Sequence, residues 1–252
     1  MRRFIEIVKK YGGKAVALLR HAKYLIQHEN CRGDKAAENL LYAANYAELD
    51  PSFQFLLSHE GCTTTWRQGK LLGRSDLPIA AVIGSEQGRG WHTALCLAEG
   101  IAGPRKRWPL YFPHACLNYP VYNFFEAQIQ RERYGDCMVP RWFNGELPGL
   151  VRDTTPRALR GRLMGFIEDT LERTDGLVVM SSHFEPCLCV ANELVYGESL
   201  GNYSLERFPN YNHGTLIVRT SEGQLQGFPF NERWEILEPV ELRNLPDHLT
   251  GH

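Results

Sequence analysis

The sequence predicts an α/β fold, a three-layer sandwich in which helices flank a mostly parallel central sheet, with cap insertions added to it. Three apolar runs support this prediction, and each is typical of a buried strand: residues 15–19, 77–85 and 176–183. Runs of small and branched apolar residues usually form strands that are covered on both faces, as in parallel sheets. Helical patterns separate these runs along the chain.

The composition is that of an ordinary globular protein. The 252 residues are 43% hydrophobic and 23% charged, which suits one large α/β domain or two small ones. The net charge of −1 argues against nonspecific binding to nucleic acid or to an acidic membrane surface. No apolar run approaches the roughly 20 residues of a membrane span, and no signal-like segment follows the basic start, so we expect a cytoplasmic protein. The seven scattered cysteines favour reduced thiols over a disulfide framework.

The first half of the chain is predicted to combine core elements with one insertion. Residues 1–12 have the spacing of a short helix that paired glycines end, and the first strand follows at 15–19. Residues 28–60 are irregular, with an alanine-rich helical stretch, and we expect them to form a cap over the site. A helix at 63–72 then ends at Gly73.

The second half continues the alternation of strands and helices. After the strand at 77–85 and a helix at 90–100, residues 104–150 hold six of the 14 prolines and many aromatics, so we expect a second cap of loops and short helices. The remaining predicted elements are a helix at 155–173, the strand at 176–183, a helix at 185–194, a strand at 215–218 and a hairpin or strand with a turn at 225–237. We therefore expect a single domain over residues 1–252.

Polar side chains follow three of the predicted strands at the point where each strand ends. The first strand ends in Arg20 and His21, the third ends in His183, and Arg89 comes shortly after the second. In a parallel sheet these ends meet at one edge, so two imidazoles, two guanidiniums and helix N-termini gather there. Arginine offers a fixed fork of donors and histidine titrates near neutral pH, so the combination suits an anion, phosphate above all.

These segments resemble the histidine phosphatase superfamily, also called phosphoglycerate-mutase-like. The hallmark of that family is Arg-His-Gly after the first strand, and Arg20-His21-Ala22 is similar to it, with alanine in place of glycine. Residues 85–94 match the family's Ser-Pro-Leu-x-Arg-Ala-x-Gln-Thr-Ala at Ser, Arg, Thr and Ala without a gap. Three further segments resemble family motifs: a Gln-Ala-x-x-Leu-Gly helix at 68–73, a Val-Val-x-Ser-His strand at 178–183 with one extra serine, and residues 212–215, which lie where the family has Asn-Gly or Asn-Cys before its last core strand.

The resemblance implies a role for each matching residue. His21 would be the nucleophile that becomes phosphorylated, while Arg20, Arg89 and His183 would hold the phosphoryl oxygens. A neutral imidazole attacks phosphorus without first losing a proton, and the cationic groups stabilise the charge on the equatorial oxygens. Gln27 lies where many members have an asparagine, so its amide either donates to a phosphoryl oxygen or packs within a loop.

The general acid is where the chain departs from the family pattern. Many members use a glutamate to protonate the leaving oxygen, but Tyr119 occupies that position, and Glu126 falls at the family's second glutamate. Three alternatives stay open: Glu126 swings into the role, Glu185 serves from just beyond His183, or the leaving group needs little protonation. The sequence narrowly favours Glu126 as the general acid. The alternative for Glu126 is a solvated carboxylate at the start of a helix, with no catalytic role. Tyr119, within an aromatic-rich stretch, is expected to contact the substrate.

The expected function is hydrolysis of a phosphate ester of a small metabolite through a phosphohistidine on His21, with no metal ion and no cofactor. The large insertions favour a substrate bigger than inorganic phosphate. Two alternatives stay open: a phosphate-ligand-binding protein of the same fold with weak or no catalysis, and a phosphomutase. Tyr119 and Lys23 depart from the mutase pattern. We expect no nucleic-acid partner and no membrane partner, and a homodimer stays open.

Overall fold

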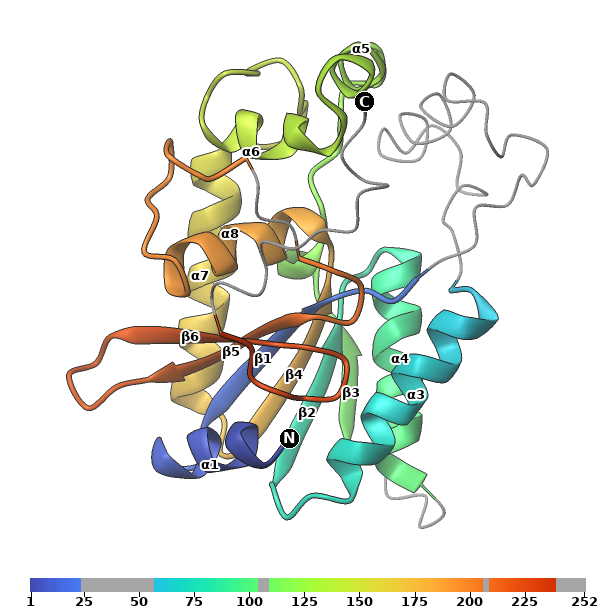
Figure 1. The fold of residues 1–252 in the computed structure, drawn as a ribbon, viewed down its shortest axis with the longest axis vertical. Coiled ribbons are helices and arrows are strands. Elements are labelled where there is room, and N and C mark those ends of the chain that lie inside the picture. The colour runs from blue at the N-terminus through green and yellow to red at the C-terminus, as the bar shows by residue number, and fades with distance from the viewer. Residues whose placement is uncertain (24–56, 104–108, 206–208, 239–252) are drawn as a thin grey trace.

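The computed structural model describes residues 1–23, 57–103, 109–205 and 209–238. Its centre is a six-stranded sheet in the order β3-β2-β4-β1-β5-β6 (Figure 1). The strands are β1 (Ala15–Arg20), β2 (Ile79–Gly84), β3 (Leu110–Pro113), β4 (Leu177–Ser182), β5 (Gly214–Arg219) and β6 (Leu225–Phe230). The first four pair in parallel with one another, and β5 and β6 pair antiparallel. The predicted α/β class with a mostly parallel sheet is confirmed.

Helices cover both faces of this sheet and complete the three layers (Figure 1). One face packs against α1 (Arg2–Lys10), α3 (His59–Gly73) and α4 (Gly88–Ala102). The other face packs against α7 (Pro156–Arg173) and α8 (Phe184–Leu194). These helices correspond to the helical patterns predicted from the sequence, apart from shifts of a few residues at their ends.

Each central strand contributes side chains to both cores. In β1, Val16 and Leu18 pack in the core beneath α7 and α8, whereas Ala17 and Leu19 pack in the core beneath α3 and α4. Successive side chains of a strand point to opposite faces, so a strand covered on both sides needs an unbroken apolar run. This is why residues 15–19 show no polar face.

The carboxyl ends of β1, β2 and β4 lie at the same edge of the sheet. Their register sets Arg20 beside Ser182, and Gly84 beside Ser181. The pairing continues one residue beyond the strands, because the N–H of His21 donates to Ser182 O at 2.8 Å. The polar residues that follow the three strands are therefore brought together, as the parallel topology requires.

The segment expected to form the second cap, 104–150, is divided between the sheet and an outer layer. Its β3 strand pairs with β2 and belongs to the sheet, so this part of the segment lies in the core fold. Two helices, α5 (Phe124–Tyr134) and α6 (Met138–Phe143), lie beyond the edge at which β1, β2 and β4 end (Figure 1). Of the first expected cap, 28–60, residues 28–56 lie outside the described residues, and His59 and Glu60 begin α3.

Helices α3 and α4 lie in close backbone contact, here called the α3–α4 seam. A Cβ atom on Gly69 would lie 2.3 Å from the carbonyl oxygen of Leu97, and one on Gly100 would lie 2.3 Å from that of Trp66. Backbone atoms cannot move aside as a flexible side chain does, so the seam requires glycine at both positions.

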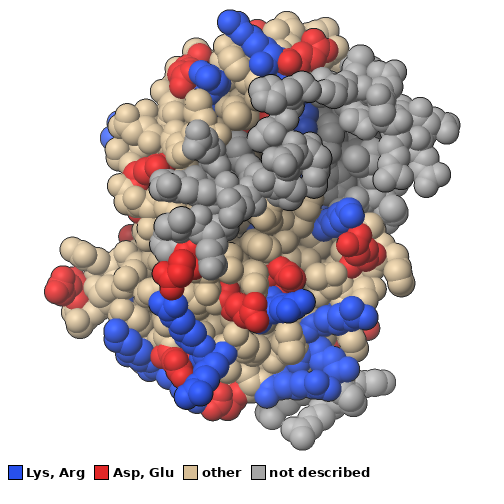
Figure 2. Space-filling model, viewed as in Figure 1, with Lys and Arg blue, Asp and Glu red and all other residues tan. Residues whose placement is uncertain are grey.

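The surface carries both signs of charge. On the face seen in Figure 2, basic and acidic side chains are interspersed over the lower half, in keeping with the net charge of −1. Several form exposed ion pairs, among them Lys9 with Asp76 and Arg3 with Glu238. Among the residues that the structure describes, no helix is both long enough and apolar enough to span a membrane.

Candidate active site

His21 is the first residue after β1, and its imidazole is buried at 1% exposure. Its Nδ1 lies 2.9 Å from the carbonyl oxygen of Ala22, and its Nε2 lies 3.0 Å from the Nε of Arg89. A carbonyl only accepts and a guanidinium only donates, so Nδ1 carries the proton and Nε2 presents a lone pair. In this tautomer the Nε2 lone pair faces the Arg89 guanidinium.

Arg89 lies in the first turn of α4, and its side chain is buried. Thr93, one turn later, holds this helix against the His21 backbone. Its hydroxyl donates to Arg89 O at 2.8 Å and accepts from the Ala22 N–H at 3.0 Å. These two bonds explain why the threonine of the 85–94 motif stands four residues after the arginine, on the same face of the helix.

His183 stands at the N-cap of α8, directly after β4, and is also buried. Its Nε2 lies 2.7 Å from the hydroxyl of Ser85, which follows β2. Gly90 permits this approach, because a Cβ there would lie 2.8 Å from Ser85 Oγ and 3.1 Å from His183 Nε2. The His183 ring centroid lies 5.2 Å from that of His21, so the two imidazoles share one pocket.

Arg20 is held at the rim of the pocket by aromatic faces. Its guanidinium lies 4.1 Å from the ring centroid of Tyr211 and 5.0 Å from that of Phe184. It also donates to the carbonyl oxygen of Pro209 at 2.9 Å. Tyr211, whose ring centroid is 5.6 Å from that of His21, was not singled out from the sequence. Its position one residue before the 212–215 motif is the signal that could have identified it.

Burial and positive charge keep both histidines neutral. Desolvation is the largest cause that lowers the pKa of His21 well below 6.5, and Arg89, His183 and Arg20 lower it further. Desolvation is also the largest cause that lowers the pKa of His183, and the charges of Arg89 and Arg20 lower it further. Both imidazoles are therefore uncharged at neutral pH, and the two guanidiniums supply the positive charge of the pocket.

Tyr119 closes another side of this pocket. Its ring meets His183 edge-on with centroids 4.7 Å apart, and the Arg89 guanidinium lies 5.2 Å from its ring centroid. Two contacts between the side-chain amide of Gln87 and the Tyr119 backbone hold it there, the shorter being 2.8 Å. The buried ring of Tyr119 therefore lies beside the pocket, at the position where the family resemblance would place a glutamate.

The two candidate carboxylates lie in different surroundings. Glu126, on α5, accepts a hydrogen bond from Gln130 at 3.2 Å, and among the described residues it forms none with the His21 pocket. Glu185, in the first turn of α8, is buried at 1% exposure and accepts from the Tyr122 hydroxyl at 2.5 Å. Its second oxygen has no hydrogen-bond partner within the described ranges.

Burial also determines the charge state of Glu185. Desolvation is the largest effect and raises the pKa of this carboxyl above 4.5. The Tyr122 hydrogen bond and the charges of Arg89 and Arg20 act in the opposite direction. The protonated form is therefore favoured more strongly than for an exposed glutamate.

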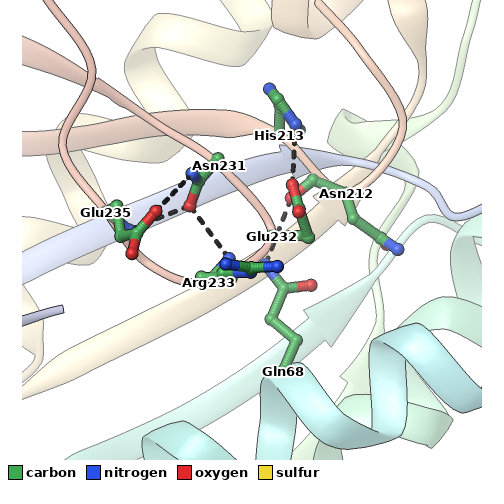
Figure 3. Close-up of polar contacts among 7 residues, drawn as sticks. All are labelled: Gln68, Asn212, His213, Asn231, Glu232, Arg233 and Glu235. Atoms are coloured by element: carbon green, nitrogen blue, oxygen red, sulfur yellow. Dashed lines mark hydrogen bonds and ion pairs between the residues drawn. The ribbon is translucent and has the colours of Figure 1, made fainter.

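The 212–215 motif joins a turn to the start of β5, and Figure 3 shows the polar contacts of Asn212 and His213 there. Asn212 has a positive φ of 59°, its N–H donates to Arg20 O at 3.1 Å, and its carbonyl accepts from the Gln68 amide at 3.1 Å. His213 is anchored by Glu232, 2.9 Å from its Nε2. The motif helix at 68–73 and the motif turn thus support each other. Gln27 lies outside the described residues.

The site therefore joins Arg20, His21, Arg89 and His183, as predicted, and adds Ser85 and Tyr211 to them. Helices α4 and α8 both begin at this edge, and their N-termini favour anions. A buried nitrogen lone pair surrounded by donors suits transfer of a phosphoryl group, because the donors neutralise its oxygens while the nitrogen attacks phosphorus.

Comparison with known proteins relates this fold to phosphatases. No protein-family model and no curated protein matches the chain. Solved structures do. A mycobacterial glucosyl-3-phosphoglycerate phosphatase in complex with inorganic phosphate aligns with a TM-score of 0.59 and 12% identity, over 88% of this chain and 100% of that one. YhfR of Bacillus stearothermophilus aligns at 0.56 and 16%, over 84% and 94%. A structure called mycobacterial hydrolase 2 aligns at 0.59 and 12%, over 91% and 95%.

This likeness identifies the fold. The chain has the α/β fold of the histidine phosphatase superfamily, the phosphoglycerate-mutase-like fold that the sequence motifs indicated. The helices and strands that carry the motifs are those expected from the sequence.

Proposed function

We propose that this protein is a phosphatase that hydrolyses a phosphate monoester of a small metabolite through a phosphohistidine on His21. The observation that carries the proposal is the state of the His21 imidazole. Its Nδ1 proton is donated to Ala22 O, and its unprotonated Nε2 faces Arg89. The imidazole shares its pocket with His183, and Arg20 borders this pocket.

The reaction has two in-line steps. In the first, a phosphoryl group enters between His21 Nε2 and the guanidinium of Arg89, a bond forms from Nε2 to phosphorus, and the bond from phosphorus to the leaving oxygen breaks. That oxygen takes one proton. In the second step, water attacks phosphorus and returns one proton to the group that protonated the leaving oxygen, the N–P bond breaks, and inorganic phosphate leaves with His21 neutral again. Arg20 and Arg89 stabilise the equatorial oxygens in both steps.

The proton of the leaving group has three possible origins: Glu185, Glu126, or no general acid at all. Glu185 has the support of its burial, its raised pKa and its electrostatic interaction with both arginines. For Glu126 to act, the carboxylate would have to exchange Gln130 for the substrate. An acyl phosphate or another good leaving group needs neither. We assign the role to Glu185 as part of this proposal.

The proposal is tested with an aryl phosphate, whose leaving group needs little protonation. The protein is expected to release the phenol, and His21→Ala is expected to abolish release. Alkaline quenching during turnover should trap a phosphoryl group on His21, detected by mass spectrometry, because the N–P bond of phosphohistidine survives in base and hydrolyses in acid. Release that survives His21→Ala would contradict the mechanism. A lack of release, combined with thermal stabilisation by inorganic phosphate, would identify a phosphate-binding protein instead.

The same experiment distinguishes the general acid and the cofactor requirement. Glu185→Gln should lower kcat for an alkyl phosphate far more than for the aryl phosphate, whereas Glu126→Gln should lower neither. The reverse pattern would assign the role to Glu126.

Activity should survive a chelator, because no step requires a metal ion. Appearance of a second phosphorylated product in place of inorganic phosphate would indicate a mutase.

A further inference from the structure

We infer that Cys62, His92 and Cys96 form a binding site for a thiophilic divalent cation, with Zn²⁺ as the physiological ion that fits best. The three side chains each present one ligand atom, and these atoms lie within 4.8 Å of one another. The site lies on the α3–α4 seam and is separate from the residues that hold phosphate in the proposed function. The inference does not depend on phosphatase activity.

The spacing of the residues explains how the cluster forms. His92 and Cys96 are four residues apart on α4, so they lie on the same face of the helix. Cys62 faces them from α3. The close packing of the two helices at Gly69 and Gly100 brings the third ligand within reach.

The distances suit a tetrahedral ion. With Zn–S near 2.3 Å and Zn–N near 2.0 Å, two ligand atoms on one tetrahedral zinc lie about 3.5–3.8 Å apart. Cys62 Sγ and His92 Nε2 are 3.8 Å apart. Two thiolates and one imidazole are a ligand set that zinc prefers, and a fourth position remains for water.

The surroundings give an ion access and leave the ligands little else to bind. Cys62 and His92 are half-buried, and Cys96 is buried in a small cluster with Ala22 and Leu57. The Leu57 N–H donates to His92 Nδ1 only over a long 3.4 Å. Coordination through Nε2 moves the imidazole proton to Nδ1 and ends this weak contact. Both thiols lose their protons to solvent when the ion binds.

Binding at this position would clamp the two helices that support the nucleophile. Ala22 follows His21 directly and packs against Cys96, while Thr93, next to His92, accepts the Ala22 N–H. An ion that joins α3 to α4 here stabilises the folded state over the unfolded chain, in proportion to its concentration relative to Kd.

The test uses Co²⁺ as a spectroscopic probe, with the full-length protein reduced and free of metal. We expect one equivalent to give thiolate-to-cobalt charge-transfer absorption and the intense visible bands of tetrahedral Co²⁺, both removed by an equivalent of Zn²⁺. Zn²⁺ should also raise Tm, and a chelator should reverse the rise. Folded protein that shows no such absorption would overturn the inference.

Variants locate the ion. Cys62→Ser and His92→Gln should each weaken Co²⁺ binding by more than about 100-fold, the upper end of what loss of an outer-shell partner costs a metal site. Cys116→Ser, a half-buried cysteine outside the cluster, is the matched control and should bind as the parent does. Far-UV circular dichroism without metal verifies that each variant folds. Unweakened binding in both ligand variants, or loss of binding in the control, would place the ion elsewhere.

Discussion

Gly90 determines how closely two side chains of the candidate site approach each other. A Cβ at this position would lie 2.8 Å from Ser85 Oγ and 3.1 Å from His183 Nε2, so Gly90→Ala should separate two atoms that now lie 2.7 Å apart. We expect a loss of about 1–3 kcal/mol in the free energy of unfolding, typical of overpacking. If His183 holds a phosphoryl oxygen, kcat/KM for an aryl phosphate should also fall by roughly tenfold or more, since each 1.4 kcal/mol is a factor of ten.

The matched control for this change is Gly161→Ala. Gly161 lies on the exposed side of α7, and a Cβ there meets nothing within 4 Å. Alanine is the better helix former by about 1 kcal/mol, so the control should be slightly stabilised with unchanged kinetics. If urea titration and steady-state kinetics gave the same result for both variants, the tight contact at Gly90 would have no consequence.

At the scale of elements, the packing of α3 against α4 at the α3–α4 seam affects the pocket, because it positions α4. Gly69→Ala would place a Cβ 2.3 Å from the Leu97 carbonyl oxygen, and neither backbone can yield without moving a helix. We expect a loss of about 3 kcal/mol or more, at or beyond the upper end of overpacking costs. Because α4 carries Arg89, KM for a phosphate ester should rise as well.

Urea unfolding followed by circular dichroism measures the first effect, and substrate titration measures the second. Gly165→Ala on α7 introduces the same methyl group where nothing lies within 4 Å, and it should not destabilise the protein. A Gly69→Ala variant as stable as the parent would show that the two helices can separate without cost.

At the scale of the whole molecule, the buried histidines give the stability a defined pH dependence. Their pKa values are lowered in the folded state, chiefly by burial, so below pH 6.5 the unfolded chain binds more protons than the folded one. Stability should therefore fall as the pH drops from 6.5 towards the lowered values, by at most about 1.4 kcal/mol per pH unit for each histidine. Above 6.5 their contribution is constant.

Comparison with the His21→Gln/His183→Gln variant isolates this contribution, because other groups titrate equally in both proteins. The parent should lose stability relative to the variant as the pH falls below 6.5, measured by urea midpoints in a pH series. A difference between parent and double variant that does not change with pH would mean that the imidazoles are not held neutral.

Much of the fold could be predicted because local patterns express it directly. Unbroken apolar runs marked β1, β2 and β4, since a strand covered on both faces tolerates no polar side. β3 was not predicted: it is four residues long, partly exposed and contains proline, so its sequence lacks that pattern. It lies within the stretch that was expected to form a cap, and its pairing with β2 depends on the sheet rather than on its own residues.

The sequence by itself determined the α/β class and the grouping of Arg20, His21, Arg89 and His183. Arg20 ends β1, His21 and His183 directly follow β1 and β4, and Arg89 follows β2 in the first turn of α4. Parallel pairing carries all of these positions to one edge. Only the tertiary structure decided the stacking of Tyr211 on Arg20, the contact of Ser85 with His183, the different surroundings of Glu126 and Glu185, and the meeting of Cys62 with His92 and Cys96. These contacts join residues distant in the chain across helix and loop packing. No period in the sequence encodes that geometry, because it depends on how closely whole elements approach one another.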